Sequence, residues 1–202
     1  MKYILGIPHT SSMELLQRAV DSIPLYQPHT IVVDNSEGHN LRHAPSISGK
    51  VQIYRPPIVL SLTQVFNYLL QRGMAENGDA VLFMHEDAEA TEGVPEQFLS
   101  LLEQYNQEGK RWGVAFTNYD ALAAFNLAAV REVGLWDTNF YAYYADNDYY
   151  RRIRDAGYET VETELPVIHH VSITAKSNPY LKKVYSSVEA IVVPYYKTKW
   201  GE

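Results

Sequence analysis

The sequence predicts an α/β fold with a mixed, mostly parallel β-sheet flanked by helices. Two observations predict it: short β-like runs alternate with helix-like segments along the chain, and the run at residues 80–84 is apolar at every position. A continuous apolar run is typical of a strand buried on both faces at the centre of a parallel sheet. Hydrophobic residues make up 46% of the 202 residues, which argues against intrinsic disorder.

Each predicted element follows from its own local pattern. Apolar residues recur at helical spacing from Met13 to Ile23, Pro95 stands in the first turn of a later helix, and Gly157 ends another. We expect strands at residues 2–7, 30–33, 51–54, 80–84, 112–117 and 121–127, with extended segments at 159–162 and 167–170. We expect helices at residues 11–23, 62–74, 95–107 and 146–156, and a short helix in the tail. Without repeats or linkers, this predicts a single domain over residues 1–202, with a compact tail from about residue 175.

Composition argues against several function classes. The net charge of −7 and the pI near 5.5 argue against a broad basic surface, so nucleic acid is not an expected partner. The absence of cysteine excludes disulfides, thiolate zinc sites and cysteine nucleophiles. No stretch reaches the roughly 20 apolar residues of a membrane span, and no signal-peptide pattern is present. We therefore expect a cytoplasmic protein without a membrane span.

Polar residues directly follow three of the predicted strands. Pro8-His9-Thr10 ends the first strand, Asp34-Asn35-Ser36 the second and His85-Glu86-Asp87 the central one. Ligands of open α/β sheets bind beyond the carboxyl ends of the strands, so these residues predict one edge of a site. Asp34 could accept a hydrogen bond from a nucleobase or ribose, or it could cap the turn at residues 35–38.

Glu86 and Asp87 form an acidic pair at the end of the central strand. Mn²⁺ and Mg²⁺ prefer oxygen ligands and are often held by one or two carboxylates together with substrate phosphates. The pair therefore predicts a cation site. The alternative is a solvated acidic loop, because Glu89 and Glu92 follow closely.

Two adjacent histidines, His169 and His170, follow the apolar residues 166–168. Side chains alternate along a strand, so at most one of the two is expected to face the site. A neutral imidazole can ligate a metal or contact a phosphate, and a purely structural role is the alternative.

Asp146 and Asp148 stand in the first turn of a predicted helix. The helix dipole stabilises carboxylates there, which is the structural explanation for both. The functional explanation is that one of them takes the proton of an acceptor hydroxyl. Tyrosines concentrated at residues 141–150 could form a platform for a sugar, or they could simply pack.

Six segments between residues 2 and 174 form a recognisable series of motifs: residues 31–36 (IVVDNS), 62–67 (LTQVFN), 81–87 (VLFMHED), 127–137, 144–157, and His169 with Thr174. In this order they resemble the inverting glycosyltransferases of family 2, which have the GT-A fold. The third segment occupies the place of the family's metal-binding DxD motif, and the fifth that of its acidic catalytic motif. Two departures stand out. His85 replaces the first acid of DxD, and Ala145 replaces the glutamate before the catalytic base.

The resemblance implies a role for each matching position. Asp146 would be the catalytic base. The implied metal ligands for Mn²⁺ or Mg²⁺ are Asp87, Glu86 and His169, with His170 as the alternative to His169. The implied nucleotide contacts are Pro8, His9, Thr10, Asp34 and Asn67, and the implied acceptor contacts are Trp136, Asp137, Tyr144 and Asp148.

The implied reaction is the transfer of a sugar from a nucleoside diphosphate sugar to a hydroxyl of a glycan or other acceptor, with inversion and metal assistance. Two other functions remain open. A nucleotidyltransferase also binds a nucleotide and a metal at strand ends, but it usually needs a glycine-rich basic loop, and residues 8–13 contain neither glycine nor lysine. A non-catalytic sugar- or nucleotide-binding module is the other, because the first DxD acid is missing. Donor, acceptor, linkage and oligomeric state stay open.

Overall fold

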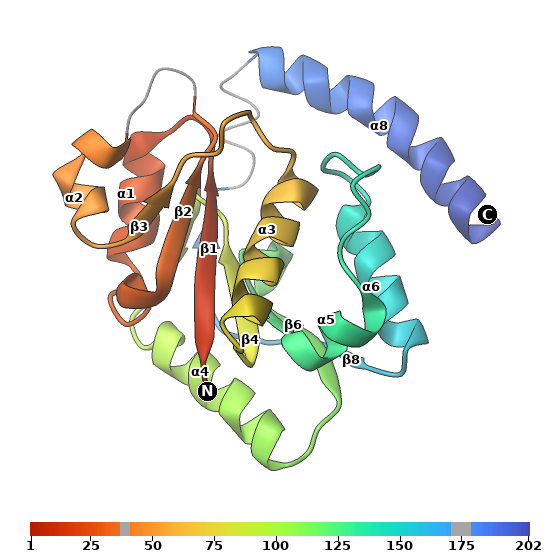
Figure 1. Ribbon diagram of the computed structural model, residues 1–202, viewed down its shortest axis with the longest axis horizontal. Coiled ribbons are helices and arrows are strands. Elements are labelled where there is room, and N and C mark those ends of the chain that lie inside the picture. Colours follow the sequence, from red (N-terminus) through yellow and green to blue (C-terminus); the bar gives the residue numbers. More distant parts are fainter. Residues whose placement is uncertain (37–40, 171–178) are drawn as a thin grey trace.

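A seven-stranded sheet forms the centre of the protein, for which a computed structural model describes residues 1–36, 41–170 and 179–202 (Figure 1). The strand order is β3-β2-β1-β4-β7-β6-β8, and only β7 runs against its neighbours. The bounds are β1 (Tyr3–His9), β2 (Thr30–Asp34), β3 (Gln52–Tyr54), β4 (Ala80–Met84), β6 (Trp112–Phe116), β7 (Leu122–Asn126) and β8 (Glu159–Glu162). A second, two-stranded sheet pairs β5 (Ala88–Ala90) with β9 (Val167–His169). The predicted mixed, mostly parallel sheet is confirmed, with β4 at its centre.

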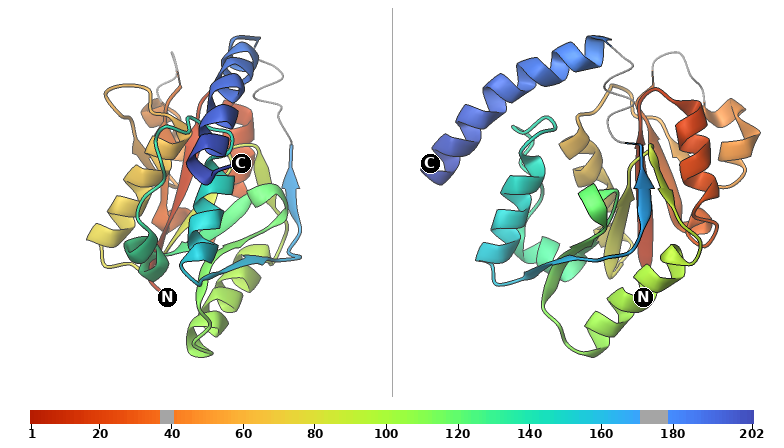
Figure 2. Two further views of the ribbon diagram at one scale, coloured as in Figure 1. Left: turned by 90° about the vertical axis from the view of Figure 1, so that its right-hand side faces the viewer. Right: turned by 180° about the vertical axis from the view of Figure 1, so that it is seen from behind.

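Helices cover both faces of the large sheet (Figures 1 and 2). One face packs against α1 (Met13–Asp21), α2 (Pro45–Ser48) and α4 (Val94–Gln107), and the other against α3 (Leu62–Ala75), α5 (Leu127–Val133) and α6 (Ala145–Asp155). Alternation along the strands produces this division: Leu82 and Met84 of β4 face the first layer, and Val81 and Phe83 the second. Short 3₁₀ turns lie at Gln27–His29, Leu41–His43 and Asn118–Asp120.

The parallel register collects the strand ends at one edge of the sheet, called the carboxyl edge below. His9 at the end of β1 stands opposite Asp34 at the end of β2, and Gly6 stands opposite Phe83 of β4. Gly6 also lets α3 lie close to β1, because a Cβ there would be 2.1 Å from a methyl of Leu69. β7 begins beside the end of β4, so the 3₁₀ turn before it lies at the same edge.

The predicted short helix of the tail is wrong. Instead, α8 (Pro179–Trp200) has 22 residues and contains Pro194, which removes one backbone donor from the helical ladder. Val192 of α8 is buried in the second layer, so tertiary packing supports a helix that Pro194 makes hard to predict. In the described part of the chain, no helix combines the length and the hydropathy that a membrane span requires.

Candidate functional site

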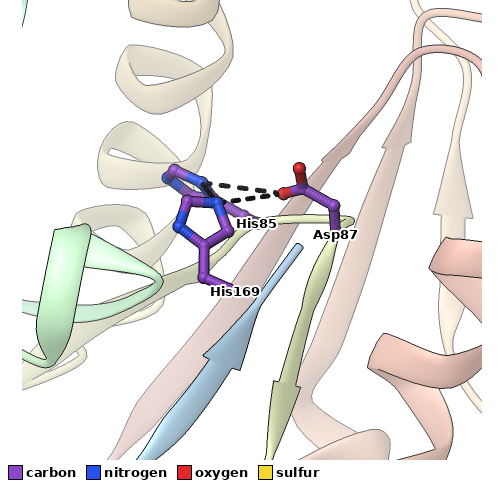
Figure 3. Close-up of side chains that lie close together, drawn as sticks. All are labelled: His85, Asp87 and His169. Carbon is purple, nitrogen blue, oxygen red and sulfur yellow. Dashed lines mark hydrogen bonds and ion pairs between the residues drawn. The ribbon is translucent and has the colours of Figure 1, made fainter. Parts of the chain in front are cut away.

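Three side chains point toward one another at the carboxyl edge: His85, Asp87 and His169 (Figure 3). His169 Nε2 lies 3.2 Å from Asp87 Oδ1 and 3.2 Å from His85 Nδ1. His85 Nδ1 and Asp87 Oδ1 are 3.9 Å apart. These three residues are called the His–Asp–His cluster below.

The two sheets together position the cluster. His85 and Asp87 lie in the turn between β4 and β5, where the His85 N–H donates to the Ala121 carbonyl at 3.1 Å, just before β7. The antiparallel pairing of β5 with β9 places His169 beside Asp87. The His170 N–H then donates to the Asp87 carbonyl at 2.9 Å and fixes the far end of the turn. Residues 84 positions apart thereby share one site.

The surroundings of His85 and Asp87 favour the protonation states that metal ligands need. Burial of the ring, and then the neighbouring His169, lower the pKa of His85 to about 4, although the nearby carboxylates oppose this. Burial opposes ionisation of Asp87, but the His169 hydrogen bond and the histidine charges outweigh it, so the pKa of Asp87 is lowered. At neutral pH, His85 is therefore a neutral imidazole and Asp87 a carboxylate.

The donor set fits a divalent transition metal. Metal–ligand bonds of about 2.0–2.2 Å put neighbouring ligand atoms roughly 3.0–3.6 Å apart. Two of the three separations in the cluster lie in that range, and the third is 3.9 Å. Two imidazole nitrogens and one carboxylate oxygen suit an ion such as Mn²⁺ better than Mg²⁺, which prefers oxygen ligands throughout.

Glu86 lies outside the cluster, and its position does not support the predicted ligand role. Its side chain turns to the end of β1, where Oε2 accepts from His9 Nδ1 at 2.5 Å and Oε1 accepts from Thr10 Oγ1 at 2.8 Å. The Thr10 N–H also donates to Oε2 at 3.2 Å. Both carboxylate oxygens therefore already have protein donors, and Glu86 is 7% exposed.

The two adjacent histidines separate, as strand alternation predicts. His169 joins the cluster, whereas His170 Nε2 pairs with Glu89 Oε1 at 2.7 Å. His170, the alternative ligand, is thus engaged elsewhere. Thr174, the last residue of the motif series, lies outside the described residues.

A cavity of about 330 Å³ opens at the ends of β2 and β3, and it is lined by Asp34, Asn35, Ser36, Arg55, Pro56, Pro57, Ile58 and Val59. Asp34 is buried, and its Oδ1 accepts from the N–H and the hydroxyl of Ser36 at 3.1 and 2.5 Å. Its Oδ2 accepts from Arg55 Nη1 at 3.1 Å. Asp34 therefore caps its own turn, which is the structural alternative raised by the sequence, and it also lines the cavity; its contact with a nucleotide stays a prediction.

The other residues predicted to contact a nucleotide lie elsewhere. The Asn67 amide holds the backbone of Trp136: Nδ2 donates to its carbonyl at 2.9 Å, and Oδ1 accepts from its N–H at 2.8 Å. His9 is completely buried against Glu86. Neither Pro8 nor Thr10 is among the described residues that line the cavity. The positions of Asn67 and His9 do not support a nucleotide contact, because their polar groups already serve the fold.

Two of the predicted acceptor residues are buried in the core. Trp136 is 5% exposed, and its ring stacks on that of Tyr149 with centroids 4.6 Å apart. Asp148 is fully buried and accepts from Arg152 Nε at 3.0 Å. Neither position supports contact with an acceptor. The sequence does not reveal this, because a matching motif does not report burial.

Residues of α8 contact the carboxylates of both Asp148 and Asp137. Lys199 Nζ bridges the two carboxylates at 2.8 and 2.7 Å, and Trp200 Nε1 donates to Asp148 at 3.1 Å. Hydrogen bonds from Lys199, the Asn139 backbone and Tyr195 outweigh partial burial and lower the pKa of Asp137 to about 2. These residues attach the tail to the body.

Tyr144, a predicted acceptor contact, lies just before α6 with a left-handed backbone (φ 63°). Its ring packs against that of Tyr196 in α8, with centroids 5.2 Å apart.

Asp146, the predicted base, is exposed in the first turn of α6, and a carboxyl that the sequence did not indicate lies near it. Asp120 precedes β7, and its Oδ2 accepts from Tyr150 Oη at 2.8 Å. Burial raises the pKa of Asp120 to about 6; the Tyr150 bond opposes the rise, and the charges of Asp146 and Glu162 add to it. The only sequence signal for Asp120 is a polar break between two predicted strands.

His85 and Arg55 were also missed as site residues. The signal for His85 was present: a histidine two positions before Asp87, in the place of a metal-binding acid. Arg55 gave no such signal, because the two prolines after it mark only a chain break.

Solved structures resemble this protein in fold. No family model matches the sequence, and no curated protein is a significant match. TarS of S. aureus has a TM-score of 0.63 at 10% identity, over 81% of this chain and 35% of that chain. GalNAc-T7, in a structure with UDP, GalNAc and Mn²⁺, has a TM-score of 0.66 at 13% identity, over 84% of this chain and 44% of that one. This chain thus spans about a third of the length of TarS and less than half of GalNAc-T7.

Two shorter proteins are matched over more of their length. Glucosyl-3-phosphoglycerate synthase from Mycobacterium tuberculosis, in complex with Mn²⁺, UDP-glucose and phosphoglyceric acid, has a TM-score of 0.60 at 13% identity, over 94% of this chain and 79% of that chain. A cytidylyltransferase from Leptospira borgpetersenii has a TM-score of 0.52 at 13% identity, over 81% and 76%. At such identities the likeness concerns the fold alone, and it confirms the prediction: this protein has the GT-A fold.

Proposed function

We propose that this protein is a metal-dependent, inverting glycosyltransferase that moves a sugar from a uridine diphosphate sugar to an acceptor hydroxyl. The observation that carries the proposal is the His–Asp–His cluster at the same sheet edge as the cavity around Asp34 and Arg55. UDP or a UDP-sugar is bound in structures of TarS, GalNAc-T7 and glucosyl-3-phosphoglycerate synthase, and the last two also contain Mn²⁺. The fold thus supports the donor class, and this chain's own residues support the metal.

The cavity at Asp34 would hold the nucleoside. Its wall combines the carboxylate of Asp34 and the guanidinium of Arg55, which are hydrogen-bonding groups, with the exposed apolar side chains Ile58 (69%) and Val59 (59%). A planar base with polar edges needs this combination of apolar and polar contacts. The diphosphate would then extend along the carboxyl edge toward the His–Asp–His cluster.

His85, Asp87 and His169 would hold the metal, and the donor set favours Mn²⁺ over Mg²⁺. A bound divalent cation supplies positive charge that stabilises the departing diphosphate. On the acceptor side, Asp146 would accept the hydroxyl proton as the hydroxyl oxygen bonds to the anomeric carbon and the bond to the diphosphate breaks. Asp146 suits this role because it is exposed, in contrast to the fully buried Asp148.

A thermal-shift panel tests the proposal without a known acceptor. UDP, GDP, dTDP and CDP are each added with Mn²⁺, with Mg²⁺ and with neither. A ligand that binds only the folded state raises the melting temperature. We expect a shift selective for UDP that needs Mn²⁺. The proposal is contradicted if no nucleotide or metal raises the melting temperature, or if all four nucleotides raise it equally. NMR of the released or transferred sugar then reads the anomeric configuration and tests inversion.

The likeness to a cytidylyltransferase makes a nucleotidyltransferase the second candidate. Such an enzyme consumes a nucleoside triphosphate and releases pyrophosphate, whereas a glycosyltransferase releases a nucleoside diphosphate. Incubation with CTP or UTP and a sugar phosphate, followed by a pyrophosphate assay, separates the two. The third candidate, a non-catalytic binding module, predicts binding of UDP with no slow hydrolysis of UDP-glucose or UDP-GlcNAc.

A further inference from the structure

The residue between two members of the cluster faces a different part of the molecule. Glu86 separates His85 from Asp87 in the chain, yet its carboxylate accepts three hydrogen bonds from the end of β1. Its donors are the His9 ring and the hydroxyl and N–H of Thr10. A carboxylate with this many protein donors is held in one orientation.

The contact between Glu86 and His9 lies inside the protein. His9 is fully buried and Glu86 is 7% exposed. Nδ1 of the His9 ring is hydrogen-bonded to Glu86, and among the described residues its Nε2 has no hydrogen-bond partner. Buried polar groups are costly to leave unpaired, so each of the two residues fixes the other.

Three sets of hydrogen bonds hold the turn that carries His85 and Asp87. The His85 N–H is bonded to the Ala121 carbonyl, and the Asp87 carbonyl to the N–H of His170. These two hold the backbone at either end of the turn. The side chain of Glu86 holds the middle, and it connects the turn to β1 rather than to β7 or β9.

We propose that Glu86 is not a metal ligand but a positioning residue, whose contacts with His9 and Thr10 hold the turn that places His85 and Asp87 beside His169. The inference rests on one part of the proposed function, the metal site. Groups that orient metal ligands from outside the first layer contribute about 10- to 100-fold to metal affinity. Glu86 acts in this way on two ligands at once, because it lies between them in the chain.

The opposite possibility is that Glu86 leaves His9 and Thr10 and binds the metal itself. Removal of the Thr10 hydroxyl distinguishes these two roles of Glu86. If Glu86 positions the turn, removal of the Thr10 hydroxyl loosens the turn and weakens metal binding. If Glu86 is a ligand, the same removal releases one carboxylate oxygen and leaves metal binding equal or tighter.

The experiment is calorimetric titration of Mn²⁺ into the full chain and four variants at one pH. We expect Glu86→Gln to weaken Mn²⁺ about 10- to 100-fold and Thr10→Val to weaken it about threefold to tenfold. Thr10→Ser keeps the hydroxyl and should stay within about twofold of the parent chain. Glu92→Gln is the matched control, an exposed acid six positions away in the same acidic stretch; it should also stay within about twofold.

Each outcome decides the matter. Unchanged or tighter Mn²⁺ binding by Thr10→Val overturns the inference, as does unchanged binding by a folded Glu86→Gln. If Glu86→Gln fails to fold, the comparison of Thr10→Val with Thr10→Ser still decides. If the parent chain binds Mn²⁺ but no nucleotide, the proposed function fails while the ratios between variants still test this inference. If the parent chain binds no Mn²⁺, both fail.

Discussion

At the scale of single residues, Asp146 and Asp155 share one helix but not one environment. Asp146 lies in the first turn of α6, near Asp120, and Asp155 ends the same helix, exposed. We expect Asp146→Asn to keep UDP and Mn²⁺ binding but to slow UDP-sugar hydrolysis and transfer about 10²- to 10⁴-fold, the usual effect of losing a general base. Asp155→Asn should leave the rates unchanged. A near-normal rate in Asp146→Asn would show that another group takes the proton.

Asp120 carries a charge that the folded state disfavours. Its folded pKa of about 6 lies above the ordinary 3.8, so this group lowers stability above about pH 6, and the penalty disappears as the pH falls toward 4. Asp120→Asn removes the charge and leaves an oxygen that can still accept from Tyr150. We expect a gain of about 1–3 kcal/mol in the free energy of unfolding at pH 8 and roughly a third of that gain at pH 4.5. Chemical denaturation at both pH values measures it, and equal gains at both would contradict the shifted pKa.

The sequence predicts where the candidate site lies but not all of its residues. Asp87 and His169 were predicted as ligands, and the structure brings them together. Glu86 was assigned with Asp87 because both are acids at a strand end, whereas the direction of each side chain depends on β1, which no local pattern reports. Asp120 could not be predicted, because its turn reaches the carboxyl edge only through the antiparallel pairing of β7 with β4.

At the scale of secondary-structure elements, α8 is attached to α6 by its last turn. Lys199 bridges Asp137 and Asp148, and Arg151 lies over the ring of Trp200 at 4.2 Å. Asp148 is fully buried, so loss of the Lys199 charge leaves this carboxylate with fewer donors. We expect Lys199→Met to lower the free energy of unfolding by about 1–3 kcal/mol. Lys197→Met, on the exposed side of the same helix, should change it by less than about 0.5 kcal/mol. Equal effects from both variants would show that the bridge contributes nothing.

Elements with a clear hydrophobic pattern in their own sequence were predictable, whereas elements that depend on tertiary contacts were not. β4 was predicted with its observed bounds, because five apolar residues in a row indicate burial on both faces. β5, with three residues, exists through its pairing with β9, and α8 through its packing against the second layer. Neither partner is near in sequence, so local reasoning predicted neither element correctly.

At the scale of the whole molecule, the strand order separates the cavity from the His–Asp–His cluster along one edge. The sheet order places β2 and β3, which carry the cavity, on one side of β1, and β4, which leads to the cluster, on the other. The sequence predicted this edge from three polar strand ends, because parallel strands must align them. The order of the strands, and so the separation of the regions, depends on long-range pairing that no local pattern contains.

This separation predicts that nucleotide and metal binding can be weakened independently. Arg55 lines the cavity and contacts Asp34, and neither residue belongs to the cluster. We expect Arg55→Ala to weaken UDP at saturating Mn²⁺ by about 10- to 100-fold, the loss of a charged hydrogen bond of roughly 1.5–3 kcal/mol. Mn²⁺ affinity without nucleotide should not change. His85→Ala should instead weaken Mn²⁺ directly and reduce UDP affinity to its metal-free value.

Calorimetry of both ligands with both variants measures this pattern, with Arg72→Ala as the control. Arg72 pairs with Glu76 at the far end of α3 and should affect neither ligand. Because coupling between two ligands is reciprocal, the factor by which Mn²⁺ tightens UDP must equal the factor by which UDP tightens Mn²⁺. In His85→Ala that factor should fall to about one, while Arg55→Ala should leave most of it in place. If Arg55→Ala abolished Mn²⁺ binding on its own, the cavity and the cluster would form one site rather than two, and the assignment of nucleoside and metal to separate strand ends would be wrong.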